Sequence, residues 1–204
     1  ADPDSHQNPP QAITLFAAFR RIVSEKEVWK LACVYCMYGF SYIIYLTFYV
    51  AYLVKEIGKS PSEAGSMFAI IGFIAIFAGL LWGAFSDKVG RRCACICIYL
   101  VLAVAYALPA FFHESFFLYL SAVMFGIAFS VPVLMAAAAG DAVGGQLAPA
   151  ALGLITLMFG IAQTIGPIIG GRIKDATGTF TYAFMLCTGF AVAGALLSLT
   201  LKAE

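Results

Sequence analysis

The stretch Gly83-Ala84-Phe85-Ser86-Asp87-Lys88-Val89-Gly90-Arg91-Arg92 decides the fold of this 204-residue chain. It places five polar or charged side chains between two apolar runs of about twenty residues, the length that crosses a bilayer. Asp87 lies at the C-terminal end of its run, where the helix dipole disfavours a carboxylate, so it needs a partner. The candidates are Arg91, Arg92 and the N-terminus of a neighbouring helix. The stretch is therefore predicted to be a charged turn at one membrane face, reversed by Gly90 in the left-handed conformation.

The composition indicates a membrane protein. Hydrophobic residues make up 62% of the chain and charged residues 11%, and the mean hydropathy is +0.93. A soluble domain is about one quarter charged, so this chain cannot cover a soluble surface and the lipid bilayer must be its solvent. The net charge of +1 and the lack of a basic stripe argue against a nucleic-acid partner.

Apolar segments recur along the chain with helical length. At a 1.5 Å rise their 20–26 residues extend roughly 30–39 Å, enough to cross a bilayer, whereas barrel strands are about half as long. The fold class is therefore all-α, with residues 28–204 as one six-helix transmembrane bundle. Residues 1–27 are a polar tail or cytoplasmic linker, in which 13–24 form either an interfacial helix or a solvated linker. The predicted spans are 28–53, 62–84, 93–112, 116–139, 150–172 and 181–201.

The distribution of Lys and Arg predicts the orientation. With the N-terminus in the cytoplasm, eight of the 12 basic residues fall inside and four outside. Both termini and the charged stretch are therefore expected at the cytoplasmic side of the cell (inner or plasma) membrane. The inside residues are Arg20, Arg21, Lys26, Lys30, Lys88, Arg91, Arg92 and Lys202, and the outside residues are Lys55, Lys59, Arg172 and Lys174.

An internal repeat relates the two halves of the bundle. The second run ends with Gly83-x-x-x-Asp87-x-x-Gly90, and the fifth run ends with Gly171-x-x-x-Asp175-x-x-Gly178, so the aspartates are 175 − 87 = 88 residues apart. A shift of three helices reverses the direction of travel through the membrane. The pattern predicts an inverted three-plus-three repeat, an arrangement found in alternating-access carriers.

These motifs resemble those of a known family. Gly83-x-x-x-Asp87-Lys88-x-Gly90-Arg91-Arg92 is similar to the loop signature of the major facilitator superfamily. Gly160 through Gly166-Pro167-x-x-Gly170-Gly171 resembles its glycine-proline helix element, and the chain is similar to the C-terminal six-helix half of bacterial members. The resemblance implies that Asp87 contacts the start of the fifth run and locks the cytoplasmic ends together when the site opens outward. It also implies a secondary transporter of a small solute, whose missing N-terminal six-helix half (or a second copy) is the partner.

Six tyrosines in the first run are candidates for the transport path. Tyr35, Tyr38, Tyr42, Tyr45, Tyr49 and Tyr52 recur at spacings of three and four, which places them on one helical face. A phenol in mid-membrane needs a hydrogen-bond partner, so this face should meet protein or a wet cavity. Tyr42, Tyr45 and Tyr49 are predicted either to bind substrate or to pack between helices.

The fourth and fifth runs carry the remaining polar and hinge candidates. Gln163 is either a substrate ligand or a helix-to-helix contact, because an amide in hydrocarbon must be paired. Pro132 and Pro167 each remove a backbone hydrogen bond and should bend their helices, as gating hinges or as fixed shape. Glycines around them are expected to allow close packing: Gly83, Gly160, Gly166, Gly170 and Gly171.

No Asp, Glu, Lys, Arg or His lies at the centre of any run. If protons are a coupling partner, their site is expected in the missing half, and Asp141 is the nearest local candidate. The six cysteines have no histidine beside them and are expected to be packing residues, so neither a metal nor a cofactor is predicted.

Two other function classes remain open. An intramembrane hydrolase would need a nucleophile such as Ser41 close to a histidine, but His6 lies in the tail and His113 in a loop. The chain is therefore expected not to be an enzyme. A receptor or scaffold could keep the carrier fold without moving solute. Measurement of solute flux after reconstitution separates these classes from a transporter.

Overall fold

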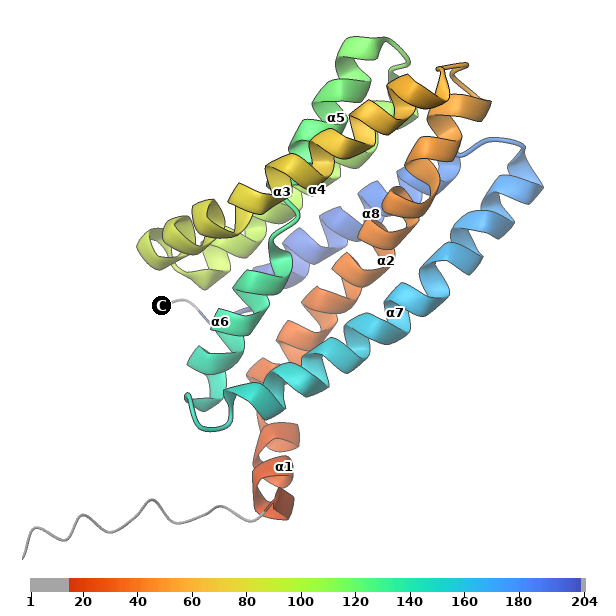
Figure 1. Ribbon diagram of the computed structural model, residues 1–204. Coiled ribbons are helices and arrows are strands. Elements are labelled where there is room, and N and C mark those ends of the chain that lie inside the picture. Colours follow the sequence, from red (N-terminus) through yellow and green to blue (C-terminus); the bar gives the residue numbers. More distant parts are fainter. Residues whose placement is uncertain (1–14, 203–204) are drawn as a thin grey trace, which may run out of the picture.

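A computed structural model describes residues 15–202; the polar tail predicted for residues 1–12 and His6 lie outside this part. Eight helices are present there, and they provide six spans that are long and apolar enough to cross a membrane (Figure 1). The ten-residue α1 is too short to be one of them, and the two short helices α5 and α6 share one span. Their bounds are α1 Leu15–Ser24, α2 Lys26–Lys55, α3 Pro61–Val89, α4 Arg91–Phe111, α5 Ser115–Ile127, α6 Val131–Val143, α7 Ala148–Thr177 and α8 Thr181–Ser198.

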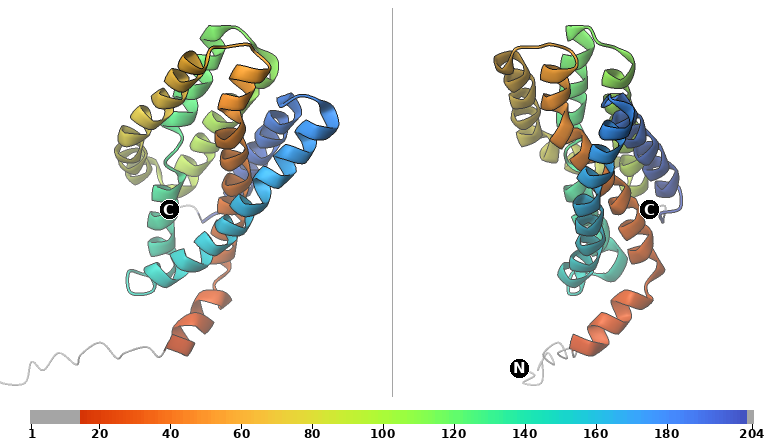
Figure 2. Two further views of the ribbon diagram at one scale, coloured as in Figure 1. Left: turned by 45° about the vertical axis from the view of Figure 1, so that its right-hand side comes forward. Right: turned by 90° about the vertical axis from the view of Figure 1, so that its right-hand side faces the viewer.

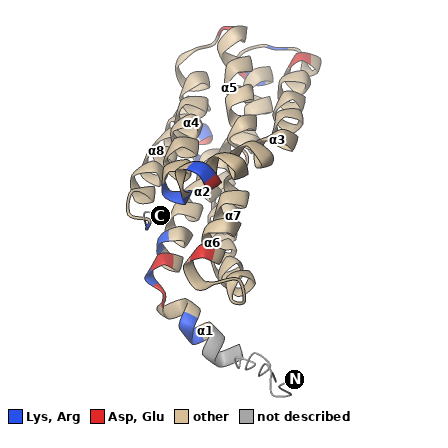
Figure 3. Ribbon diagram, turned by 90° about the vertical axis from the view of Figure 1, so that its left-hand side faces the viewer, with Lys and Arg blue, Asp and Glu red and all other residues tan. Residues whose placement is uncertain are grey.

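The two ends of the bundle differ in what they carry. The start of α2, the end of α8, the α3–α4 turn and the α6–α7 connection lie at one end, which we call the termini end (Figure 2). The α2–α3, α4–α5 and α7–α8 connections lie at the other, which we call the far end. Charged residues lie toward the helix ends and in the connections, and leave the middle of every span uncharged (Figure 3).

The helices pack as an inverted three-plus-three repeat, as predicted. The first repeat is α2, α3 and α4, and the second is α5–α6, α7 and α8. The first span of each repeat packs against the second and third spans of the other: α2 contacts α7 and α8, and α5–α6 contacts α3 and α4. The two third spans, α4 and α8, pack extensively on each other. This reciprocal pattern is what a two-fold relation between the repeats requires.

The spans differ in how much of their apolar surface is buried, and α8 is intermediate with 39% of its window buried. In α2, α4 and the α5–α6 span more than half of the most apolar 18-residue window is buried, but in α3 and in α7 only 17% is. These two helices are the second spans of their repeats and flank the bundle. Each exposes a row of apolar side chains, such as Phe73, Ile76 and Leu80 of α3 and Leu157, Ile161 and Ile168 of α7.

The charged stretch is mostly helix, not a turn as predicted. The helix α3 continues through Asp87 to Val89, and α4 begins at Arg91, so Gly90 alone reverses the chain. Its φ of +84° is a conformation that glycine adopts without a Cβ clash. Gly178, the equivalent residue in the second repeat, has a φ of +77°. The N-terminal end of α3 is fixed by a capping box between Ser60 and Glu63, with Pro61 in the first turn.

The fourth span is broken in mid-membrane, where the sequence predicted one run with a bend. α5 ends at Ile127 and α6 begins at Val131, with Pro132 in its first turn. Side chains of the first repeat bind the carbonyl groups freed by the break. Trp82 donates its indole N–H to the Ile127 carbonyl at 2.7 Å, and Tyr38 donates to the Phe129 carbonyl at 3.4 Å. Irregular backbone at this depth is tolerated when protein groups satisfy it in this way.

Glycines allow α2 and α7 to approach closely. A Cβ at Gly39 would lie 2.7 Å from the Phe159 carbonyl oxygen, and one at Gly166 would lie 2.7 Å from Ile43 Cγ2. Gly170 contacts Phe48 in the same manner, and Gly171 makes an ordinary contact with it. A Cβ at Gly160 or at Gly83 would meet no described atom within 4 Å, so the close packing predicted there is not made within this bundle. The helix α7 continues without a break through Pro167.

We expect Gly39→Ala to lower the melting temperature of the purified protein in detergent by several degrees. The new methyl group must push α7 away from α2, at a cost of about 1–3 kcal/mol. Alanine gains only about 0.5–1 kcal/mol over glycine from helix propensity. Gly160→Ala is the matched control and should leave the melting temperature unchanged or raise it. Equal melting temperatures for the two variants would contradict this packing.

Candidate functional site

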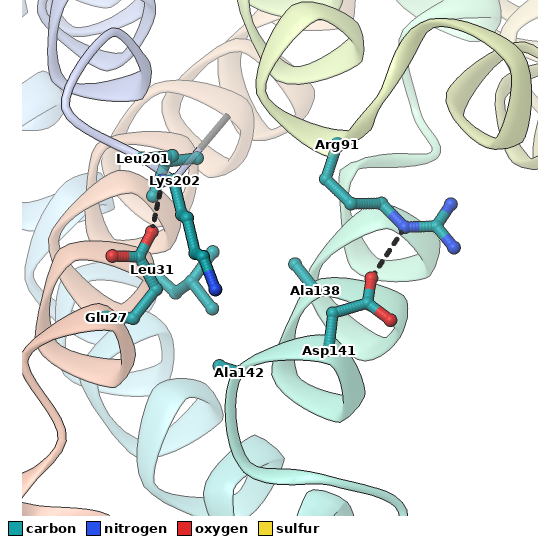
Figure 4. Close-up of a pocket in the computed structure, with 8 residues that line it drawn as sticks. All are labelled: Glu27, Leu31, Arg91, Ala138, Asp141, Ala142, Leu201 and Lys202. Atoms are coloured by element: carbon teal, nitrogen blue, oxygen red, sulfur yellow. Dashed lines mark hydrogen bonds and ion pairs between the residues drawn. The ribbon is translucent and has the colours of Figure 1, made fainter. Parts of the chain in front are cut away.

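Arg91 links three helices at the termini end. Its Nη1 donates to Asp87 Oδ1 and to Ser86 Oγ, both at 2.7 Å, and its Nε donates to Asp141 Oδ2 at 2.9 Å. Asp87 and Ser86 belong to the last turn of α3. Asp141 belongs to the last turn of α6, and Figure 4 shows its contact with Arg91. We call Ser86, Asp87, Arg91 and Asp141 the termini clasp. The clasp joins the turn between α3 and α4, in the first repeat, to α6, which belongs to the first span of the second repeat.

The clasp follows from the sequence argument about helix dipoles: Arg91, one of the partners predicted for Asp87, pairs with it, and Asp141 is an additional partner. Both carboxylates lie at C-terminal helix ends, where the guanidinium of Arg91 offsets the unfavourable dipole. The resemblance implied a contact from Asp87 to the start of α7; instead Arg91 reaches α6. Asp141, predicted only as a weak proton site, is this partner. Arg92 and Lys88 form no ion pair within the described part of the chain.

A small cavity of about 70 Å³ lies beside the clasp. Arg91 and Asp141 line one side of it, and Glu27 and Lys202 line the other (Figure 4). Glu27 accepts hydrogen bonds from the backbone N–H of Lys202 at 2.7 Å and from Lys30 Nζ at 2.9 Å, so the chain after α8 is held against the start of α2. Two separate polar contacts therefore hold helix ends together at the termini end.

The tyrosine face of α2 is buried, and most of its hydroxyl groups bind other helices. Tyr45 shares a 2.6 Å hydrogen bond with Ser121, and Tyr49 donates to the Leu118 carbonyl at 2.6 Å. Both side chains are fully buried. The prediction that Tyr45 and Tyr49 line a transport path therefore fails within this bundle, and the packing alternative accounts for them. The hydroxyl groups of Tyr45 and Tyr49 are both directed at α5.

Tyr42 differs from its neighbours. It is 9% exposed, and its hydroxyl has no hydrogen bond within residues 15–202. Its ring stacks on Phe159 of α7 with centroids 5.5 Å apart and meets Phe129, in the break of the fourth span, edge-on at 6.1 Å. This phenol lies between the broken span and α7, and although the side chain is largely buried, its hydroxyl group is free to bind a ligand.

Gln163 lies on α7 one turn beyond Phe159 and is half-buried. Its amide makes no hydrogen bond to a described residue. The structure therefore does not pair it with another helix, which was the structural alternative. Tyr42 and Gln163 are the sequence-predicted path residues whose polar groups remain unpaired in the spans. Trp82, which holds the break, was not predicted; its position one residue before Gly83 gave no distinct signal.

Comparisons with known proteins place the chain in a family. Residues 7–199 match the family model described as "Uncharacterised MFS-type transporter YbfB". A protein of Agrobacterium vitis assigned as a tartrate transporter is 30% identical over 184 residues, covering 88% of this chain and 42% of that protein. The hexuronate transporter of Bacillus subtilis is 29% identical over 197 residues, covering 85% of this chain and 44% of its own length. The chain thus spans less than half of the relatives it matches.

A solved structure shows the same fold. The chain superimposes on a structure reported for proton-dependent oligopeptide transporters with a TM-score of 0.77 at 16% identity, covering 87% of this chain and 42% of that one. The family match extends over nearly the whole chain and agrees with the six spans, the inverted repeat and the charged glycine motif. This multi-pass membrane protein belongs to the MFS-type transporter family.

Proposed function

We propose that the chain forms one half of a secondary transporter that moves a small solute by alternating access. The observation that carries this proposal is the match of residues 7–199 to a transporter family. The inverted repeat supports it, because carriers built from such repeats rock one bundle against another around a site near the bilayer midplane. Flux of a solute into vesicles that contain the complete carrier tests it, and binding without flux would favour a receptor.

The second half of the carrier is proposed to cover α3 and α7. These flanking helices leave most of their apolar windows unburied, and they are equivalent in the two repeats. Relatives more than twice as long as the chain have room for a second bundle. A second copy of this chain is the other partner that would satisfy the same surface. In either arrangement, Tyr42, which contacts Phe129 of the break and Phe159 of α7, is proposed to contact the substrate. Gln163, one turn beyond Phe159 on α7, is proposed to do the same.

The proposed substrate is a small hydroxylated carboxylate. The two relatives above are named for tartrate and hexuronate, and both compounds combine carboxylate and hydroxyl groups. The described spans offer neutral hydrogen-bonding groups at mid-depth and no charge there. Tyr42 and Gln163 therefore suit the hydroxyl groups of such a solute. Neutralisation of its carboxylate, and any proton coupling, are proposed for residues of the other half.

The termini clasp is proposed to face the cytoplasm and to control the conformational equilibrium. The excess of Lys and Arg at the termini end supports this orientation in the cell membrane. The clasp ties the end of α3 to the end of α6, below the break in the fourth span. With the clasp formed, the cytoplasmic end of α6 is held in place; with the clasp open, α6 is free to swing about residues 128–130.

We expect Arg91→Gln to lower the maximal transport rate roughly fivefold, because loss of about 1 kcal/mol from the clasp shifts the equilibrium between the two access states. The substrate concentration that half-saturates binding should change much less. Initial uptake rates and equilibrium binding measured on the same vesicles distinguish the two effects. Arg92→Gln, which removes the neighbouring charge but no described ion pair, should keep the parent rate. An equal loss in both variants would show that net charge matters, not the clasp.

We expect Tyr42→Phe to weaken substrate binding by about three- to tenfold, the effect of one lost hydrogen bond to a ligand. Tyr45→Phe is the matched control, since it removes a hydroxyl from the same helix face. It should lower the melting temperature by breaking the buried bond to Ser121 and leave the binding constant unchanged. Binding and melting curves of the two proteins decide the assignment; an unchanged binding constant in Tyr42→Phe contradicts it.

A further inference from the structure

A second cluster of polar contacts lies at the far end of the bundle. Glu56 is the C-cap residue of α2. Its Oε1 accepts a hydrogen bond from the backbone N–H of Phe180 at 2.8 Å, and its Oε2 accepts one from Thr179 Oγ1 at 2.8 Å. Lys174 Nζ lies 3.3 Å from Glu56 Oε1 and 5.1 Å from the centre of the Phe180 ring. We call Glu56, Lys174, Thr179 and Phe180 the far clasp.

The far clasp occupies the position that the repeat assigns to the termini clasp. Gly90 and Gly178 are 178 − 90 = 88 residues apart, and both have positive φ. The residue after each glycine, Arg91 or Thr179, donates to a carboxylate at the end of the first span of the other repeat. That carboxylate is Asp141 of α6 in one case and Glu56 of α2 in the other. The two clasps therefore join the same elements at opposite ends of the bundle.

In both clasps, a carboxylate at the C-terminus of a helix is stabilised, but the stabilising groups differ. A carboxylate at the C-terminus of its own helix is disfavoured by the helix dipole. At the termini end, the guanidinium of Arg91 offsets this effect. At the far end, the carboxylate of Glu56 lies at the N-terminus of α8, where the dipole and the free N–H of Phe180 favour it. Lys174 supplies the compensating charge.

The far clasp is also the better shielded of the two. The side chains of Glu56 and Lys174 are 18% and 26% exposed, whereas that of Asp141 is 42% exposed and that of Asp87 is 66% exposed. Ion pairs that are partly withdrawn from water are screened less by salt. The sequence repeat pointed to Asp175 as the equivalent of Asp87, but Asp175 is exposed and forms no described ion pair. At the far end, the ion pair is formed by Glu56 and Lys174 instead.

We propose that Glu56 is the positioning residue of a second latch, which holds the far end of the carrier closed as the termini clasp holds the other end. This inference rests on the proposed alternation of access. Each clasp fixes one end of a flanking helix, α3 through Asp87 or α7 through Lys174, and these helices are proposed to meet the second half of the carrier. Loss of a clasp should therefore loosen the contact between the halves at that end and raise the population that is open there. Loss of the far clasp and loss of the termini clasp should therefore shift the equilibrium in opposite directions.

Accessibility of one mid-span residue from the two sides tests the proposal. The complete carrier, with its cysteines replaced and Tyr42→Cys as the reporter, is placed in sealed vesicles and treated with a membrane-impermeant maleimide from either side. Glu56→Gln should increase the labelling rate about fivefold from the side that the far end faces, the change that corresponds to about 1 kcal/mol. Asp141→Asn should increase it from the side of the termini end.

Two further variants complete the design. Lys174→Gln breaks the same ion pair but leaves the carboxylate of Glu56 at the N-terminus of α8. It should increase labelling from the same side as Glu56→Gln, and it tests the latch if Glu56→Gln does not fold. Asp175→Asn removes a carboxylate from the same face and should label like the parent. Unchanged labelling in Glu56→Gln and Lys174→Gln, or a shift in the same direction as Asp141→Asn, would overturn the proposal. The labelling needs no substrate, so its failure is distinct from a failure to transport hydroxylated carboxylates.

Discussion

Lipid offers no hydrogen bonds, so each polar group that enters the bilayer must find its partner inside the protein. The tyrosine face of α2 shows how this requirement organises the bundle. Tyr49 and Tyr52 donate to main-chain carbonyls of α5 and α4, and Tyr45 binds Ser121. Within the described residues, every side-chain nitrogen or oxygen atom that is completely buried has a hydrogen-bond partner. These bonds fix the rotation of α2 and direct its tyrosine face toward the centre of the bundle.

The same requirement explains why the fourth span can be broken without loss of the fold. Its break exposes carbonyl groups at mid-depth, and Trp82 and Tyr38 satisfy two of them from α3 and α2. The lower part of the span, α6, is then held at its other end by Arg91. The helix α6 is joined to α5 through an irregular segment and not through a continuous helix, so it is well suited to move as a unit. The proposed transport cycle uses this property.

Carboxylates at helix ends give the bundle its polar contacts at both faces. Asp87, Asp141 and Glu56 each lie where their own helix dipole disfavours a negative charge. Each is stabilised by a residue at the turn between the second and third spans of a repeat, or beside it. The arrangement joins the two repeats at opposite ends and leaves the flanking faces of α3 and α7 apolar. The polar contacts between the repeats are thus separated from the apolar surface that we propose for a second bundle.

The sequence by itself determined the class of protein, the number of spans, the repeat and the family, because these depend on composition, length and spacing along the chain. It also determined that Asp87 needs a partner and that the six tyrosines share one face. Only the tertiary structure decided that the partner of Arg91 across the bundle is Asp141, that Tyr45 and Tyr49 are packing residues, and that the fourth span is broken. These outcomes depend on how far apart two helices lie and how each is rotated about its axis. Neighbouring helices set both quantities, and a periodic pattern within one helix cannot specify them.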